Sequence, residues 1–234
     1  MVKVVANMAM IIYPSITSIS KNGAFEKLKE VNQLKLTTIS FFPTGLSATE
    51  RQAFYQQLKT SSVKKIACLH LRNDMQKKEI NWLIKTYQVD YLNIHPQGSL
   101  YPFNLDLSFC RDQIYIENSF TLIQEEELKK YAGLCLDFAH LENDRLLRLR
   151  VYLEINKLIK RTKVGWAHIG AITAKPYLSP ISNRLTHDNH FFTSLSQFDY
   201  LKKYRPILPF VLALELENNI KQQLEVKQYL EKIL

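Results

Sequence analysis

Short apolar runs alternate with amphipathic stretches along the chain. Most of the runs are almost wholly apolar, which is typical of parallel strands that helices cover. Eight such strands alternating with helices predict an α/β fold, a (β/α)8 TIM barrel with a parallel eight-stranded sheet and outer helices, as one domain over residues 1–234. The predicted strands are residues 2–10, 36–42, 66–69, 89–94, 113–116, 134–136, 164–167 and 210–214.

The segments between these runs predict the helices. Helical spacing or capping signals favour helices over residues 20–32, 47–58, 74–84, 124–131, 143–160, 194–204 and 217–234. Ser47 and Glu50 have the spacing of a capping box. Residues 169–192 hold two prolines and are expected to be irregular. A doubly wound open sheet is the structural alternative, but the glycine-rich phosphate-binding motifs that accompany it are absent from the sequence.

Histidine and carboxylate residues stand where the predicted strands end. Because chemistry in such a barrel takes place at the carboxyl ends of the strands, these side chains are expected to meet at one rim. The candidate metal ligands are His70, His95, Glu117, Asp137, His140, His168, Asp188, His190 and Glu215. Individually, each has a structural interpretation: a hydrogen-bonded histidine, a helix cap at Asp137, or a solvated loop over residues 187–190. Their concentration at one rim favours a metal site.

The ligand types narrow the choice of metal. Imidazole and carboxylate groups without thiolates suit zinc, manganese, iron or cobalt better than magnesium or calcium. The three cysteines, Cys68, Cys110 and Cys135, fall within or between predicted strands and are poorly placed to be ligands. Their odd number and expected burial predict reduced thiols in a cytoplasmic protein.

Composition and charge add weaker constraints. The formal net charge of +9 favours a polyanionic partner, nucleic acid above all, although a general lysine bias is an equal alternative. No apolar run reaches the roughly 18 residues of a membrane helix, so no membrane partner is expected. The apolar N-terminus lacks a basic leader and a cleavage site, and it predicts a strand rather than a signal peptide.

The strand-end motifs resemble those of the xylose-isomerase-like barrel superfamily. The motifs are LHLRND, LNIHPQGS, IEN, LDFAH, WAHIG, DNH and LELEN, in chain order. The superfamily groups AP endonuclease family 2, the endonuclease IV-like enzymes, with isomerases and epimerases of sugars and sugar phosphates. By this resemblance the quartet Glu117, Asp137, His168 and Glu215 would bind one metal ion.

The resemblance to endonuclease IV-like enzymes implies three zinc ions and hydrolysis of a phosphodiester bond in DNA. His70 and His95 would hold the first ion, with Glu117 bridging to the second. The second would also be held by Asp137, His168 and Glu215, and the third by His140, Asp188 and His190.

The resemblance to the isomerases and epimerases of the superfamily implies a different reaction at the same rim. One zinc, manganese or cobalt ion would polarise a sugar, while Glu117 and Glu215 would act as the catalytic proton-transfer pair. His95 and His140 would hold substrate hydroxyls. Short loops favour this alternative, as does Leu71-Arg72-Asn73 after His70, in place of the aromatic–apolar pair of endonuclease IV. The sequence leaves both alternatives open, the phosphodiester hydrolase and the sugar isomerase or epimerase. Trp82 and Trp166 are expected in core or helix packing. Tyr101 and Phe103 are expected either to line the mouth or to serve in ordinary loop packing, with equal weight.

Overall fold

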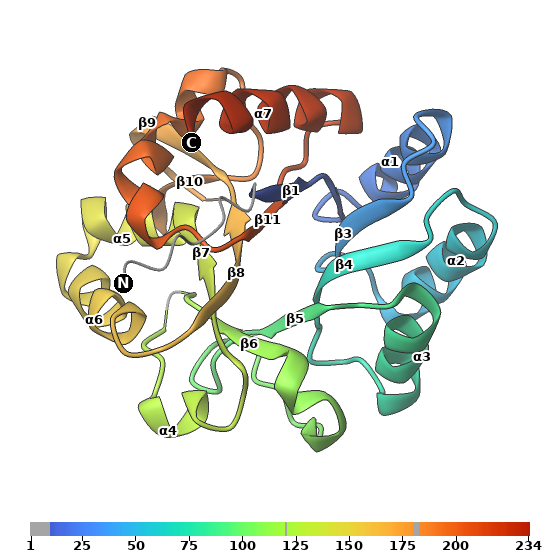
Figure 1. The fold of residues 1–234 in the computed structure, drawn as a ribbon, viewed down its shortest axis with the longest axis horizontal. Helices are drawn as coiled ribbons and strands as arrows, with labels where there is room; N and C mark the ends of the chain where they lie inside the picture. The colour runs from blue at the N-terminus through green and yellow to red at the C-terminus, as the bar shows by residue number, and fades with distance from the viewer. Residues whose placement is uncertain (1–9, 120, 180–182) are drawn as a thin grey trace, which may run out of the picture.

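A parallel sheet that is nearly closed on itself forms the centre of the molecule, with helices around it (Figure 1). The computed structural model describes residues 10–119, 121–179 and 183–234. In these residues nine strands pair in the order β1-β11-β8-β7-β6-β5-β4-β3-β2. They are β1 (Ile11–Tyr13), β2 (Ser15–Thr17), β3 (Thr38–Phe42), β4 (Lys65–His70), β5 (Tyr91–Ile94), β6 (Ile114–Glu117), β7 (Gly133–Asp137), β8 (Val164–Ile169) and β11 (Val211–Leu214). This confirms the predicted α/β barrel.

The two ends of the sheet are β1 and β2, which are neighbours in the chain and are separated only by Pro14. β1 pairs with β11 and β2 pairs with β3, so together they act as the first barrel strand and bring the sheet's edges together. Proline has no N–H to donate, but the Pro14 carbonyl accepts from the Ser40 N–H at 2.9 Å. The strand predicted at residues 2–10 lies outside the described residues up to residue 9, and Met10 is not in a strand.

Helices follow most strands and cover the outside of the sheet. They are α1 (Lys21–Gln33), α2 (Ala48–Lys59), α3 (Lys77–Tyr87), α4 (Glu125–Leu128), α5 (Phe138–Leu147), α6 (Leu149–Ile159) and α7 (Ile220–Ile233). The predicted capping box is present: Ser47 Oγ accepts from the Glu50 N–H, and the Glu50 carboxylate accepts from the Ser47 N–H. None of the helices in the described part of the chain has both the length and the apolar character that crossing a bilayer requires.

The segment expected to be irregular contains an antiparallel hairpin instead. β9 (Ala171–Leu178) pairs with β10 (Leu185–Asn189) in a separate two-stranded sheet. β9 is mostly exposed, so its sequence lacks the apolar run of a barrel strand. Thr186 and Asp188 in β10 are polar yet buried. The expectation failed because main-chain pairing, not an apolar face, holds these two strands together.

Three predicted helices also differ from expectation, and one of them, expected over residues 124–131, is shortened to the four residues of α4. The helix expected over residues 143–160 is broken at Arg148, whose backbone is not helical, and α5 extends back to Phe138 directly after β7. Residues expected to form a helix at 194–204 form the 3-10 helix η2 (Leu195–Ile207). Phe198, Leu201 and Tyr204 are buried there at a spacing of three residues, which matches the three residues per turn of a 3-10 helix. A further 3-10 helix, η1 (Ser108–Gln113), precedes β6.

The start of β7 requires glycine. Gly133 has a φ of +145°, and a Cβ there would lie 2.3 Å from the Lys163 carbonyl oxygen. This close approach allows the Leu134 N–H to bond the same carbonyl at 2.9 Å and brings β7 against β8. Towards the other ends of these two strands, Asp137 and His168 are paired in register.

Arg51 of α2 is a fully buried charge outside the barrel rim. Its guanidinium bonds the Glu79 carboxylate at 2.7 Å, Asp74 at 3.1 Å and the Leu46 carbonyl at 3.0 Å. We expect Arg51→Ala to lower the free energy of unfolding by about 3–5 kcal/mol, because it leaves the largely covered carboxylate of Glu79 without its cation. Urea denaturation measures this loss.

The matched control for Arg51 is Arg161→Ala. Arg161 pairs with Glu125 at 3.5 Å, and both side chains are more than half exposed. An exposed pair of this kind contributes about 0–1 kcal/mol. Equal stabilities for the two variants would contradict the role given to the buried network.

Candidate metal centre

The candidate ligands lie at the carboxyl ends of the barrel strands, as the topology of a parallel barrel requires. β4, β6 and β7 each end in one, β8 carries one near its end, and β5 and β11 are each followed directly by one. The remaining three are on the first turn of α5, within β10 and just after it. In chain order the residues are His70, His95, Glu117, Asp137, His140, His168, Asp188, His190 and Glu215.

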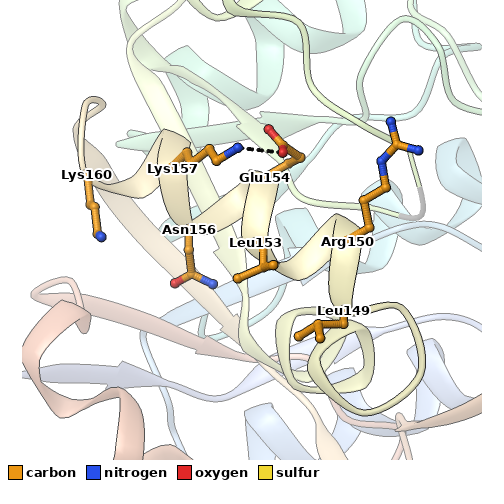
Figure 2. Close-up of a pocket in the computed structure, with 7 residues that line it drawn as sticks. All are labelled: Leu149, Arg150, Leu153, Glu154, Asn156, Lys157 and Lys160. Carbon is orange, nitrogen blue, oxygen red and sulfur yellow. Dashed lines mark hydrogen bonds and ion pairs between the residues drawn. The ribbon is translucent and has the colours of Figure 1, made fainter.

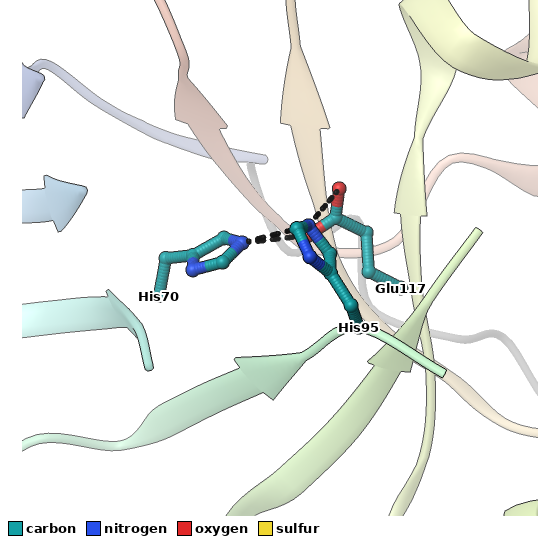
Figure 3. Close-up of side chains that lie close together, drawn as sticks. All are labelled: His70, His95 and Glu117. Atoms are coloured by element: carbon teal, nitrogen blue, oxygen red, sulfur yellow. Dashed lines mark hydrogen bonds and ion pairs between the residues drawn. The ribbon is translucent and has the colours of Figure 1, made fainter. Parts of the chain in front are cut away.

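His70, His95 and Glu117 form the first ligand group (Figure 3). The Nε2 atoms of the two histidines are 3.2 Å apart, and His70 Nε2 lies 3.3 Å from Glu117 Oε2. His95 Nε2 lies 3.8 Å from Glu117 Oε1. Two imidazoles that bind one tetrahedral ion at 2.0–2.1 Å place their nitrogens roughly 3.3 Å apart. The spacing of this group therefore suits a shared metal ion.

Glu117, Asp137 and His168 form the second ligand group, and Glu215 adjoins it. His168 Nδ1 lies 3.7 Å from Glu117 Oε2 and 3.9 Å from Asp137 Oδ2. Its distance to Glu215 Oε2 is 3.1 Å. Within each group one ligand atom per residue can be chosen so that all lie within 4.8 Å of one another. Glu117 belongs to both groups, so its carboxylate is common to the two candidate ligand sets.

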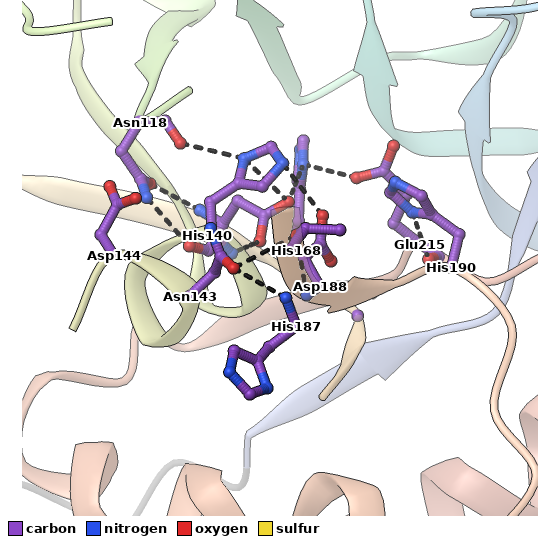
Figure 4. A network of polar contacts seen from close by, with 12 residues as sticks. Asn118, His140, Asn143, Asp144, His168, His187, Asp188, His190 and Glu215 are labelled. Carbon is purple, nitrogen blue, oxygen red and sulfur yellow. Dashed lines mark hydrogen bonds and ion pairs between the residues drawn. The ribbon is translucent and has the colours of Figure 1, made fainter. Parts of the chain in front are cut away.

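His140, Asp188 and His190 are brought together less tightly (Figure 4). His140 Nε2 lies 3.3 Å from Asp188 Oδ2. His190 is fixed instead through its Nδ1, which is 3.2 Å from the main-chain carbonyl of Glu215. Among the described residues, these three do not form a group as compact as the first two.

Two histidines of this third set share a feature of metal ligands. His140 Nδ1 is 3.1 Å from the Asn118 carbonyl, just as His190 Nδ1 is bonded to the Glu215 carbonyl. An Nδ1–H donated to a carbonyl fixes the tautomer and leaves Nε2 as the ligand atom. Both side chains can therefore offer Nε2 to an ion.

Buried charges at the rim shift one another's pKa values in different directions. Burial raises the pKa of Asp137 to about 6, and the carboxylates of Asp188 and Glu215 add to this shift. For Glu215, burial alone would raise the pKa, but His190 and His168 outweigh it and set the pKa at about 2. Burial lowers the pKa of His190, but the charges of Glu215 and Asp188 outweigh this effect and raise the pKa to about 9. These buried carboxylates attract positive charge, which protons or a metal ion can supply.

Unpaired polar atoms at the rim also fit a metal ion. His168 Nε2, His70 Nδ1 and Asp188 Oδ1 are buried, and none has a hydrogen-bond partner in the described part of the chain. Such groups are costly to bury unless something satisfies them. The donor set is imidazole and carboxylate, as zinc, manganese, iron or cobalt prefer. Buried acidic and histidine groups that could hold a metal ion are therefore present.

The cysteines do not contribute to this donor set. Cys68, Cys110 and Cys135 are free and buried. Burial raises the pKa of each thiol, which keeps it neutral and a poor metal ligand.

The aromatic residues occupy different places around the rim. Trp166 is fully buried inside the barrel, with its ring 4.7 Å from that of His168, whereas Trp82 packs on Tyr55 of α2. Tyr101 is exposed, and its ring lies 6.1 Å from that of His95. Phe103 is buried instead of lining the mouth.

Sequence reasoning missed three buried asparagines around the ligands. Asn93 Nδ2 donates to Glu117 Oε2, and Asn118 is bonded to the main chain of Asp137. Asn143 Oδ1 accepts from the His187 N–H and thereby holds β10 on α5. The available signal was a polar residue inside or directly after an apolar run, as in LNIH and IEN.

A surface hollow elsewhere on the molecule contains none of these residues. It lies on the outer side of α6 and is lined by Leu149, Leu153, Lys157 and neighbouring residues (Figure 2). Its lining offers a single carboxylate, Glu154, which pairs with Lys157 at 2.8 Å. The rim of the barrel, not this hollow, is the candidate site for chemistry.

The sequence matches no family model, and none of the curated proteins compared with it is similar. The function is therefore argued from the ligand groups and their surroundings.

Proposed function

We propose that this protein is a metal-dependent enzyme that hydrolyses phosphodiester bonds at a multinuclear zinc site. The observation that carries the proposal is the position of Glu117, which is common to two ligand groups. A carboxylate shared in this way suits two neighbouring cations. Paired cations of this kind are typical of phosphodiester hydrolysis.

The residues would hold the ions in three sets. His70 and His95 would bind the first with Glu117, and Asp137, His168 and Glu215 would complete the second. His140, Asp188 and His190 would bind the third. When bound, the cations would supply positive charge against a phosphodiester and lower the pKa of water.

The chain itself orients these ligands and keeps bulk water out. Asn93 donates to Glu117 Oε2 and so fixes the rotation of the shared carboxylate. Main-chain carbonyls fix the tautomers of His140 and His190. Glu117, Asp137 and His168 are at most 2% exposed, whereas the His95 side chain is 22% exposed. A substrate therefore approaches on the His95 side.

The proposed substrate is DNA, and DNA with an abasic site is the first to test. The net charge of +9 supports a polyanionic substrate. The order of all nine candidate ligands also supports it, because it resembles that of endonuclease IV-like enzymes. Zinc is the proposed metal, and manganese and cobalt suit the same donors.

A sugar or sugar-phosphate isomerase or epimerase is the second candidate. It is favoured by the two carboxylates, Glu117 and Glu215, that lie 3.7 and 3.1 Å from the same nitrogen of His168. In this reading one divalent ion is bound and the two glutamates move a proton between substrate carbons. The short connections, such as the direct passage from β7 into α5, fit a small substrate.

Metal content separates the two candidates. We expect close to three zinc ions per chain when protein purified without chelators or added metal is analysed by plasma mass spectrometry. The same preparation is then expected to nick DNA that contains an abasic site. One equivalent of zinc, manganese or cobalt would favour the isomerase, and no metal even after reconstitution would overturn both candidates.

A further inference from the structure

Asn118 is fully buried at the point where β6 leaves the barrel, directly after Glu117. Its side-chain amide forms two bonds with the main chain of Asp137. Asn118 Oδ1 accepts from the Asp137 N–H at 2.7 Å, and Nδ2 donates to the Asp137 carbonyl at 2.9 Å. The last main-chain pair between the two strands is Glu117 with Cys135. The amide of Asn118 therefore continues the pairing of β6 and β7 to the residue that carries the ligand.

The main chain of Asn118 reaches a second ligand. Its carbonyl lies 3.1 Å from His140 Nδ1, while the Asp137 carboxylate caps α5 by accepting from the His140 N–H at 2.8 Å. Figure 4 shows Asn118 beside His140 at the edge of this network. Asn118 thus contacts two candidate ligands, and none of its hydrogen bonds within the described residues runs to His70 or His95.

We propose that Asn118 is a positioning residue that sets Asp137 and His140 relative to Glu117. The inference rests on the proposed metal site. It adds that loss of Asn118 weakens the binding of some ions and not of others. Loss of the amide frees the end of β7 from β6, so ions held by Asp137 or His140 lose affinity. The ion held by His70, His95 and Glu117 keeps its ligands in place. Substitution of such outer residues typically lowers metal affinity 10–100-fold.

Gln113 offers a matched control at the opposite end of β6. Its Nε2 donates to the Val89 carbonyl at 2.7 Å, so it is also a side-chain amide bonded to a neighbouring main chain. It precedes β6, whereas the candidate ligands are at the other end. Gln113→Ala removes one comparable bond without touching a ligand.

The experiment is a zinc competition titration of wild type, Asn118→Ala and Gln113→Ala against a chromogenic chelator. We expect Asn118→Ala to lower the affinity for some of the bound zinc ions by about 10–100-fold, while one ion keeps its wild-type affinity. Gln113→Ala should match wild type. Unchanged binding, or equal weakening of all the equivalents, would overturn the inference. A wild type with a single equivalent would count against the phosphodiesterase, yet Asn118→Ala should still weaken that ion relative to Gln113→Ala.

Asn118→Asp tests the same role if the alanine variant does not fold. It keeps the side-chain volume and the acceptor for the Asp137 N–H but loses the donor to the Asp137 carbonyl. A purely electrostatic effect would tighten zinc binding, because the variant adds a negative charge beside the cations. Positioning predicts weaker binding instead. Affinity equal to or tighter than that of wild type would overturn the inference.

Discussion

Glu117→Gln is expected to abolish activity and to weaken metal binding in both compact ligand groups. Glu117 is 2% exposed and belongs to the group with His70 and to the group with His168. Glutamine keeps the shape but replaces one carboxylate oxygen by an NH2 donor, so it cannot bridge two cations. We expect the loss in zinc affinity to exceed the 10–100-fold effect of an outer residue. Zinc titration and an abasic-site nicking assay measure the two effects.

Glu127→Gln is the control for this substitution. Glu127 is also a buried glutamate, but it belongs to neither compact ligand group; it accepts the Gln97 N–H at a distance of 2.9 Å. Its replacement should leave zinc binding unchanged. Full activity and full metal content in Glu117→Gln would remove the basis of the proposed site.

The strand ends were predictable because the fold itself places them. Once apolar runs at regular intervals predict a parallel barrel, every carboxyl end lies on one rim. The sequence could therefore indicate that His70, Glu117 and His168 meet, although they are far apart in the chain. It could not give the distances between them, which depend on strand register and on the bulge between β7 and β8.

The structure also shows why two interpretations of Asp137 could not be separated in the sequence. Asp137 Oδ1 caps α5 by accepting the His140 N–H at 2.8 Å. Its Oδ2 lies 3.5 Å from His140 Nδ1 and 3.9 Å from His168 Nδ1. The helix cap and the candidate ligand are the same side chain, because its two oxygens face different partners.

The asparagine contacts that support the ligand residues could not be predicted from the sequence. Asn93, Asn118 and Asn143 act on partners 19 to 44 residues away, and no local spacing marks such pairs. The hairpin β9–β10 was not predicted from the sequence for a related reason. Thr186, His187 and Asp188 are buried by contact with α5, so polar residues occupy positions where an apolar pattern was required for a strand.

His190→Ala decides whether the third set holds an ion. Its Nδ1 is bonded to the Glu215 carbonyl, so Nε2 is the atom available to a metal. If three ions are bound, we expect the variant to lose one zinc equivalent and to retain the ions at the two compact groups. Its nicking activity should fall by at least about tenfold, because one of the charges acting on the phosphodiester is removed. Plasma mass spectrometry counts the ions directly.

His187→Ala supplies the comparison from the same hairpin. His187 is buried, and its Nδ1 is bonded to the Thr173 carbonyl at 2.7 Å, yet it is not one of the candidate ligands. Both variants remove an imidazole with one bond to a main-chain carbonyl, and His187 is the more buried of the two. A general loss of stability would therefore be at least as large in His187→Ala. Loss of zinc in His190→Ala alone would assign the third ion to His140, Asp188 and His190. Unchanged stoichiometry in His190→Ala would leave Glu117 as the centre of a two-ion or one-ion site, with the third set holding substrate.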